Sequence, residues 1–155
     1  MPKLIRTGRE KGQRGQALVE FALLVPIFFV LLFAIVDFGM GFYSWITVTN
    51  SAREGARIGA VHPPLDIAGS PCFGKASLDE CIQDRVRATA GLADQDTKMD
   101  VFVSGEEGLP GQSVVVKVDY RYDLISPLAG LVQLLSADTI ESTLNLSSTA
   151  DMRLE

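Results

Sequence analysis

The chain has 155 residues, of which 47% are hydrophobic and 21% are charged, and its formal net charge is -5. This composition excludes a disordered chain, a collagen-like chain and a coiled coil. Met1–Gly15 carries a net charge of +4 and the remainder a net charge of -9, so the bulk of the chain offers no basic face to a nucleic acid. One histidine and two cysteines leave little material for a metal site or a catalytic triad. We therefore predict a protein that is not an enzyme, with no cofactor, no metal, no nucleic-acid partner and no small-molecule substrate.

The first predicted element is an apolar helix. Phe21–Val36 contains no polar side chain, and apolar flanks extend the stretch to about residues 17–40. At roughly 1.5 Å per residue this helix is about 36 Å long, enough to cross a lipid bilayer. Basic residues precede it, so the positive-inside rule places the N-terminus in the cytoplasm and the acidic remainder outside. Pro26 lies within the stretch and predicts a helix kink, although membrane helices also tolerate proline without special function.

A secretory signal peptide is an alternative reading of the same segment, because it also has a basic start and an apolar middle. The apolar run is longer than usual for such a peptide. Only Gly39-Met40-Gly41 loosely resembles a cleavage site. This alternative predicts that the segment is removed after Gly41.

Glu20 lies at the edge of the apolar stretch, where a lone carboxylate is unfavourable unless it is paired or near the interface. If a peptidase cuts after Gly15, Gln16 becomes the first residue and carries a new positive amino group. The amino group of a neighbouring subunit could then pair with Glu20. Two alternatives stay open, since Glu20 could instead complement the helix dipole or reach its own amino group four residues earlier.

Two runs of sequence form recognisable motifs. The first is a prepilin-like processing site, a glycine followed after four residues by glutamate and an aromatic residue, with phenylalanine here where tyrosine is usual. It reads Gly15-Gln16-Ala17-Leu18-Val19-Glu20-Phe21-Ala22-Leu23-Leu24-Val25-Pro26. The second reads Asn50-Ser51-Ala52-Arg53-Glu54-Gly55-Ala56-Arg57. Together these two runs resemble the TadE-like family of pilus assembly proteins, and the resemblance covers about residues 15–60.

This resemblance implies a minor pilin, or pseudopilin, of a tight-adherence (Tad, or Flp) pilus, which supports surface adhesion and biofilm formation. An inner-membrane prepilin peptidase is expected to cleave between Gly15 and Gln16, and Glu20 and Phe21 are expected to act in processing and assembly. The expected partners are the bilayer, that peptidase, other pilin subunits and the assembly platform. Gln16 departs from the aromatic first residue of other type IV pilins, which leaves methylation of the new N-terminus open.

Two other functions stay open beside this one. The chain could be a permanently anchored single-pass envelope protein whose periplasmic domain binds a partner. It could also be a minor pseudopilin of a type II-like secretion system. The nature of the mature N-terminus separates the permanent anchor from the processed pilin.

The predicted organisation is a leader over residues 1–15, a helix over 16–62 and an exported head over 63–155. The helix is expected to continue to about His62. A kink or restart near Asn50 stays open as an alternative, because the following residues 51–54 fit a capping box. A stripe of small residues lies on one face of this helix, formed by Ala52, Gly55, Ala56, Gly59 and Ala60. It is expected to pack either against the head's own sheet, which we favour, or against another subunit. Arg53, Glu54 and Arg57 are expected to form a solvated face.

The exported head is predicted to be α+β and pilin-like, with one helix packed on a three-stranded antiparallel sheet. Cys72 and Cys81 lie outside the cytoplasm in this topology and are expected to form a disulfide. A capping box at residues 77–80 opens a helix that ends at Gly91. Apolar residues alternate with polar ones at 99–104, 114–122 and 140–154, which predicts three strands, while residues 127–135 form a short helix or an apolar loop.

Overall fold

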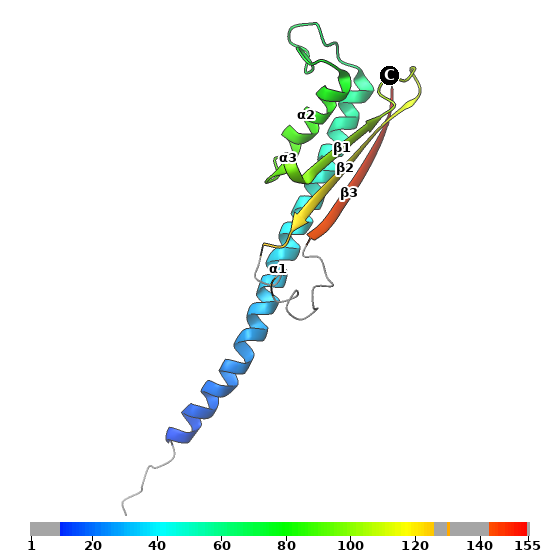
Figure 1. Cartoon of the computed structure of the whole chain (residues 1–155). Helices are drawn as coiled ribbons and strands as arrows, with labels where there is room; N and C mark the ends of the chain where they lie inside the picture. Colours follow the sequence, from blue (N-terminus) through cyan, green and yellow to red (C-terminus); the bar gives the residue numbers. More distant parts are fainter. Residues whose placement is uncertain (1–9, 126–129, 131–142, 155) are drawn as a thin grey trace, which may run out of the picture.

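The structure is a computed structural model that describes residues 10–125, 130 and 143–154, with side chains from Gly15 onward. The basic residues before Glu10, most of the segment 127–135 and the expected strand residue Ile140 lie outside the described residues. One long helix, α1 (Glu10–Val61), runs the length of the molecule, and a small head packs along its C-terminal half (Figure 1). The α+β fold predicted from the sequence is confirmed.

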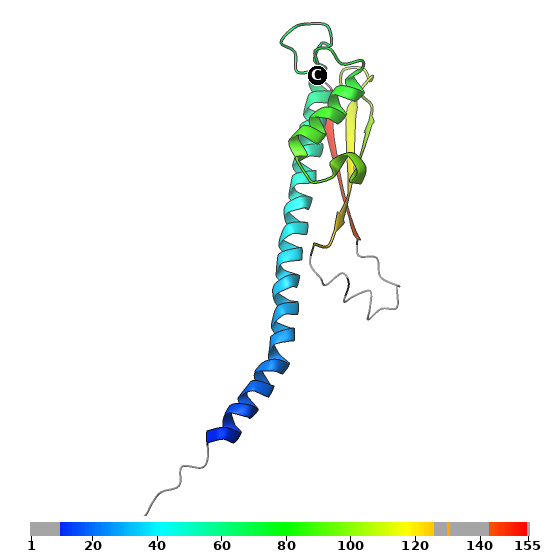
Figure 2. The same ribbon diagram turned by 60° about the vertical axis from the view of Figure 1, so that its left-hand side comes forward.

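Helix α1 is continuous through Pro26 and through Asn50, so the alternative of a restart near Asn50 is wrong. Instead of capping a new helix, the Ser51 hydroxyl donates to the carbonyl of Val48 at 2.9 Å. The helix begins at Glu10, within the basic leader, and its blue end curves away from the axis of the cyan part (Figure 2). It ends at Val61, because His62 has a φ of 49° and two prolines follow.

The head follows in the order α2 (Leu78–Ala90), α3 (Gln95–Lys98), β1 (Met99–Ser104), β2 (Ser113–Asp123) and β3 (Thr143–Arg153). The strands form one antiparallel sheet with β2 in the centre. Val118 is aligned with Val101 of β1 and with Ser148 of β3, which fixes the register on both sides. The short helix α3 was not expected, because four residues are too few to show a helical period.

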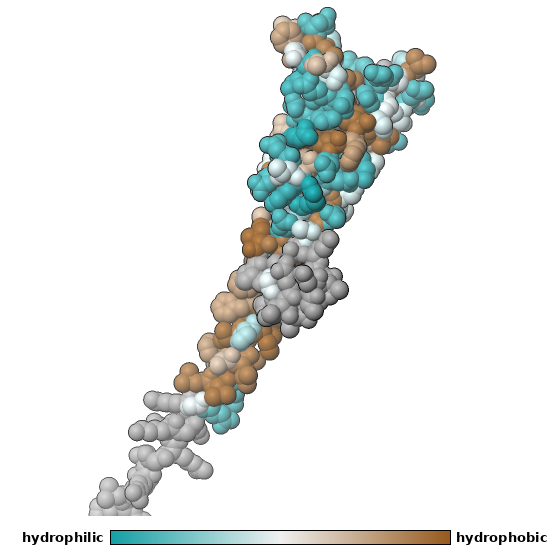
Figure 3. Space-filling model, in the orientation of Figure 1, coloured by the Kyte–Doolittle hydropathy of each residue, from teal (hydrophilic) through white to brown (hydrophobic). Residues whose placement is uncertain are grey.

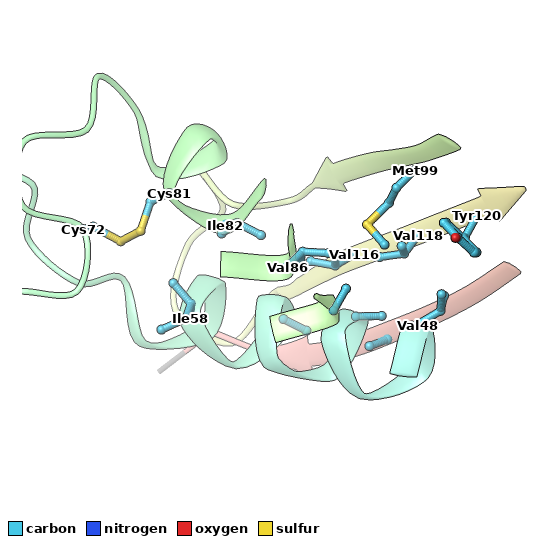
Figure 4. Close-up of a cluster of buried hydrophobic side chains, with 14 of the residues drawn as sticks. Val48, Ile58, Cys72, Cys81, Ile82, Val86, Met99, Val116, Val118 and Tyr120 are labelled. Atoms are coloured by element: carbon cyan, nitrogen blue, oxygen red, sulfur yellow. A yellow bond between two sulfur atoms is a disulfide. The ribbon is translucent and has the colours of Figure 1, made fainter. Parts of the chain in front are cut away.

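The core lies between the sheet, α1 and α2 (Figure 4). The even-numbered residues of β2 are buried, as their alternation with polar residues predicts, and β-branched valines favour the extended backbone there. Ala150 on β3 and Leu154, directly after the strand, are buried, but Leu144 is 49% exposed, so the expectation of a buried face is wrong at that end of the strand. Leu144 is aligned with Tyr122, near the end of β2.

Helix α2 has the ends that its sequence predicts. The Ser77 hydroxyl accepts the N–H of Glu80 at 3.1 Å, and Gly91 closes the helix with a φ of 54°. Cys72 and Cys81 form a disulfide with a Cα–Cα distance of 5.4 Å, and both are buried. The disulfide ties the loop after α1 to the first turn of α2.

Candidate assembly segment and its junction with the head

The N-terminal half of α1 is apolar and has no covering from the rest of the described chain. Its most apolar stretch of 18 residues has a mean hydropathy of 2.8 and none of it is buried. Phe28 is 60% exposed and Leu31 is 59% exposed. Figure 3 shows this surface as brown atoms below a largely teal head. By length and composition, α1 is consistent with a single membrane span.

The predicted processing site lies at the start of this exposed surface. Gly15, Gln16, Glu20 and Phe21 are all exposed and lie on α1. The side-chain amide of Gln16 donates to Oε1 of Glu20 at 3.1 Å, so the carboxylate has a neutral partner one turn away. A side chain added at Gly15 meets no atom within 4 Å. These residues are therefore free of any role in holding the head.

Asp37 joins α1 to the end of β2, and sequence reasoning missed this role. Although it lies in the apolar stretch, Asp37 is only 4% exposed. Its Oδ1 accepts the N–H of Ile125 at 3.1 Å, and its carbonyl accepts the hydroxyl of Tyr122 at 3.4 Å. Burial, and then the negative charge of Asp37, raise the pKa of Tyr122. The sequence did contain a signal for this role, because an acidic residue within an apolar run needs a partner.

The stripe of small residues lets α1 approach the sheet and α2 closely. A Cβ at Gly55 lies 2.5 Å from Cγ2 of Val86 and 3.3 Å from Cγ1 of Val116. A Cβ at Gly59 lies 2.9 Å from Cγ2 of Val114. The three alanines of the stripe, Ala52, Ala56 and Ala60, are also buried. The stripe packs in the head's own core, which is the reading that the sequence favoured, and its face is not available to another subunit.

Glu54 links α1 to α2, so its expected place on a solvated face is wrong. Arg57 donates to both carboxylate oxygens at 2.9 Å. Arg85 of α2 donates to Oε1 from Nε at 3.0 Å and from Nη2 at 2.9 Å. The Glu54 side chain is 21% exposed, and its hydrogen bonds, first those from Arg57, lower its pKa to about 2. Arg85 was missed because it lies 31 residues away in the sequence.

The geometry defines a class of protein. A helix that is bare and apolar in one half and docked on an α+β head in the other is a candidate membrane anchor carrying a folded domain. Among the residues that the structure describes, no group of three or more histidine, cysteine or acidic side chains could hold a metal ion.

Residues 15–57 match the family model of the TadE-like proteins, so this segment of the chain is similar to that family. The match begins at Gly15 and ends at Arg57, so it covers most of α1 and none of the elements from α2 to β3. No curated protein and no solved structure matches the chain. Similarity to this family, which is generally non-catalytic, suggests an association with the Tad pilus.

Proposed function

We propose that this chain is a minor pilin, or pseudopilin, of a Tad pilus, and that a prepilin peptidase cleaves it between Gly15 and Gln16. The observation that carries the proposal is the order Gly15, Glu20 and Phe21 at the exposed start of an apolar helix, within the segment that matches the family. In this proposal α1 spans the inner membrane with its basic end in the cytoplasm, and the head lies outside. The processed protein joins a pilus or is required for its assembly, which supports adhesion and biofilm formation.

Cleavage changes the charge balance at the start of α1. It removes the basic leader and creates an amino group on Gln16, one helical turn from Glu20. In a stack of such helices, shifted along their axis, the amino group of one subunit pairs with Glu20 of its neighbour. Pairing offsets the few kcal/mol that a lone carboxylate costs near hydrocarbon. This charge pair sets the register of the subunits in the bundle.

The exposed surface of α1 supports this role, because it provides a large apolar area outside the head's core. Lipid covers that area while the subunit is in the membrane, and the helices of other subunits cover it in an assembly. The glycine stripe is already used inside the head, so the subunit contacts are assigned to the apolar half of α1.

Replacement of Gly15 by leucine tests the cleavage step. We expect Gly15→Leu to keep its leader and to remain in the inner membrane. The substitution should leave the fold intact, because nothing lies within 4 Å of a Cβ added at this exposed position. Gly39→Leu is the matched control, since Gly39 lies in the same helix with equally open surroundings. Mass spectrometry of the mature N-terminus measures the outcome.

Each result distinguishes one of the proposed functions. A wild-type N-terminus at Gln16 supports the processed pilin, and an intact leader in functional protein supports a permanent anchor. A wild-type N-terminus after Gly41 supports a signal peptide. Assembly of Gly15→Leu at the wild-type level contradicts the proposal that cleavage is required.

A further inference from the structure

An apolar groove of about 450 Å³ lies where the head meets the bare half of α1. Aromatic residues of α1 form one wall, and leucines from the ends of the sheet form the other: Phe38, Phe42, Trp45, Leu124, Leu144 and Leu146. The carboxylate of Asp37 borders the groove and is occupied by the N–H of Ile125. Ile125 is 65% exposed and Leu144 is 49% exposed. We call this apolar end of the head, formed by Leu124, Ile125, Leu144 and Leu146, the basal surface.

The hydrogen bonds to Asp37 fix the height of the basal surface along α1. Ile125 and Tyr122 both bind Asp37, which lies inside the predicted span of residues 17–40. Asp37 is roughly 5 Å before the end of that span, at the helical rise of 1.5 Å per residue. If α1 spans the bilayer, the basal surface lies at the level where the helix leaves the hydrocarbon.

We propose that the basal surface is a second lipid contact, which rests on the outer leaflet and places Ile125 and Leu144 at the boundary between headgroups and acyl chains. This inference depends on the membrane insertion of α1 in the proposed function. It assigns the head an orientation, because a helix and a separate lipid contact together restrict both tilt and rotation. The opposite end of β2 then points away from the membrane.

Two observations favour lipid over a protein partner. The basal surface is continuous with the apolar surface of α1 through Phe38, which is 76% exposed, and Trp45, which is 46% exposed. Aromatic residues at this level match the preference of tryptophan for the membrane interface, and short apolar segments bind there by burying a few side chains.

Trp45 is the single tryptophan of the chain, so fluorescence can report on one chosen position at a time. In a Trp45→Phe background, Ile125→Trp and Leu144→Trp each place a reporter on the basal surface. Leu109→Trp is the control, because Leu109 is 72% exposed and lies beyond the opposite end of β2, about 36 Å away along the strand. The full chain is reconstituted in phosphatidylcholine vesicles that contain lipid brominated either near the headgroup or near the chain end.

We expect lipid brominated near the headgroup to remove most of the emission of Ile125→Trp and Leu144→Trp, and lipid brominated near the chain end to remove less. Leu109→Trp should respond to neither. Emission from both basal reporters that is insensitive to both lipids overturns the proposal, including the case of a blue-shifted emission, which indicates that protein covers the surface. Circular dichroism and the intact disulfide establish that each variant is folded.

Extraction with alkaline carbonate separates this inference from the proposed function. If the variants stay in the vesicles and the basal reporters are not quenched, the anchor stands and the lipid contact of the head is wrong. If carbonate strips the wild-type protein from the vesicles, the anchor is wrong and the lipid contact is wrong with it.

Discussion

The carboxylate of Glu20 has a local partner in the side chain of Gln16, at 3.1 Å, before any cleavage takes place. The donor of this hydrogen bond is an uncharged amide and the bond is exposed to solvent, so it stabilises the helix by at most about 1 kcal/mol. A new amino group near the carboxylate offers a stronger, charge-assisted partner. In the proposed function, removal of the leader would therefore change the partner of Glu20 from an amide to an ammonium group.

Replacing Glu20 by alanine tests this change of partner. We expect Glu20→Ala to be cleaved normally but to assemble poorly, because its helix has lost the charge that sets the register. Mass spectrometry measures cleavage, and counting pili by electron microscopy measures assembly. Gln16→Ala removes the local partner and keeps the new amino group, so it should assemble well. Normal piliation of Glu20→Ala would show that the charge pair is not needed.

The lowered pKa of Glu54 predicts how the stability of the head depends on pH. Its pKa is about 2 in the folded chain, against an ordinary value of 4.5, so the unfolded chain binds more protons between these values. The stabilisation is fully present above about pH 4.5 and is lost as the pH falls toward 2. After allowance for solvent screening it amounts to about 1–2 kcal/mol.

Urea unfolding in detergent, near neutral pH and at a pH of about 3, measures this loss. Arg85→Gln should make the pH dependence weaker, because Glu54 loses its link to α2. Arg53→Gln removes the same charge from an exposed side chain and should leave the pH dependence unchanged. Equal behaviour of the two variants would contradict the assigned role of Arg85.

At the scale of elements, α1 has two halves with different surroundings. The first is bare and apolar, and the second packs on β2, β3 and α2 over a face of small residues. A face of small residues has no large side chains to bury. It stabilises the head because it lets the backbone of α1 lie close to α2 and the sheet. Each of the two glycines in the stripe destabilises the helix by about 1 kcal/mol relative to alanine. The close packing that they permit offsets this loss.

Gly55→Ala should therefore destabilise the head although alanine is the better helix former. Its Cβ lies 2.5 Å from Val86, so overpacking should lower the free energy of unfolding by about 1–3 kcal/mol. Gly39→Ala is the control, since no atom lies within 4 Å of the added carbon. Thermal unfolding followed by circular dichroism measures both. A Gly55→Ala protein as stable as the control would show that the core can relax around the extra carbon.

Most elements could be predicted because their signals are local. The alternation of Val118, Tyr120 and Tyr122 with charged residues predicts β2, and Ser77 with Gly91 predicts both ends of α2. Helix α3 and the role of Arg85 could not be predicted, since one is too short for a period and the other depends on a distant partner. For the same reason, the exposure of Leu144 follows from its position at the end of the sheet and not from its alternation.

At the scale of the whole molecule, the proposed topology places the acidic head outside the cytoplasm. Cys72 and Cys81 report on this directly, because disulfides persist in the envelope and are reduced in the cytoplasm. We expect both thiols to be oxidised in cells. Alkylation with a maleimide polymer, with and without prior reduction, measures their state by a shift in gel mobility. Free thiols in untreated cells would contradict the proposed orientation.

The sequence by itself determined the apolar helix, the charge asymmetry across it, the processing signature and the alternating strands, because each depends on residues that are neighbours along the chain. The tertiary structure decided what the small-residue stripe packs against, which groups hold Glu54, and that Asp37 fixes the head at the end of the apolar stretch. The contact of Glu54 with Arg85 joins residues 31 positions apart, and that of Asp37 with Ile125 joins residues 88 positions apart. Only the folded chain brings such groups within hydrogen-bonding or van der Waals distance.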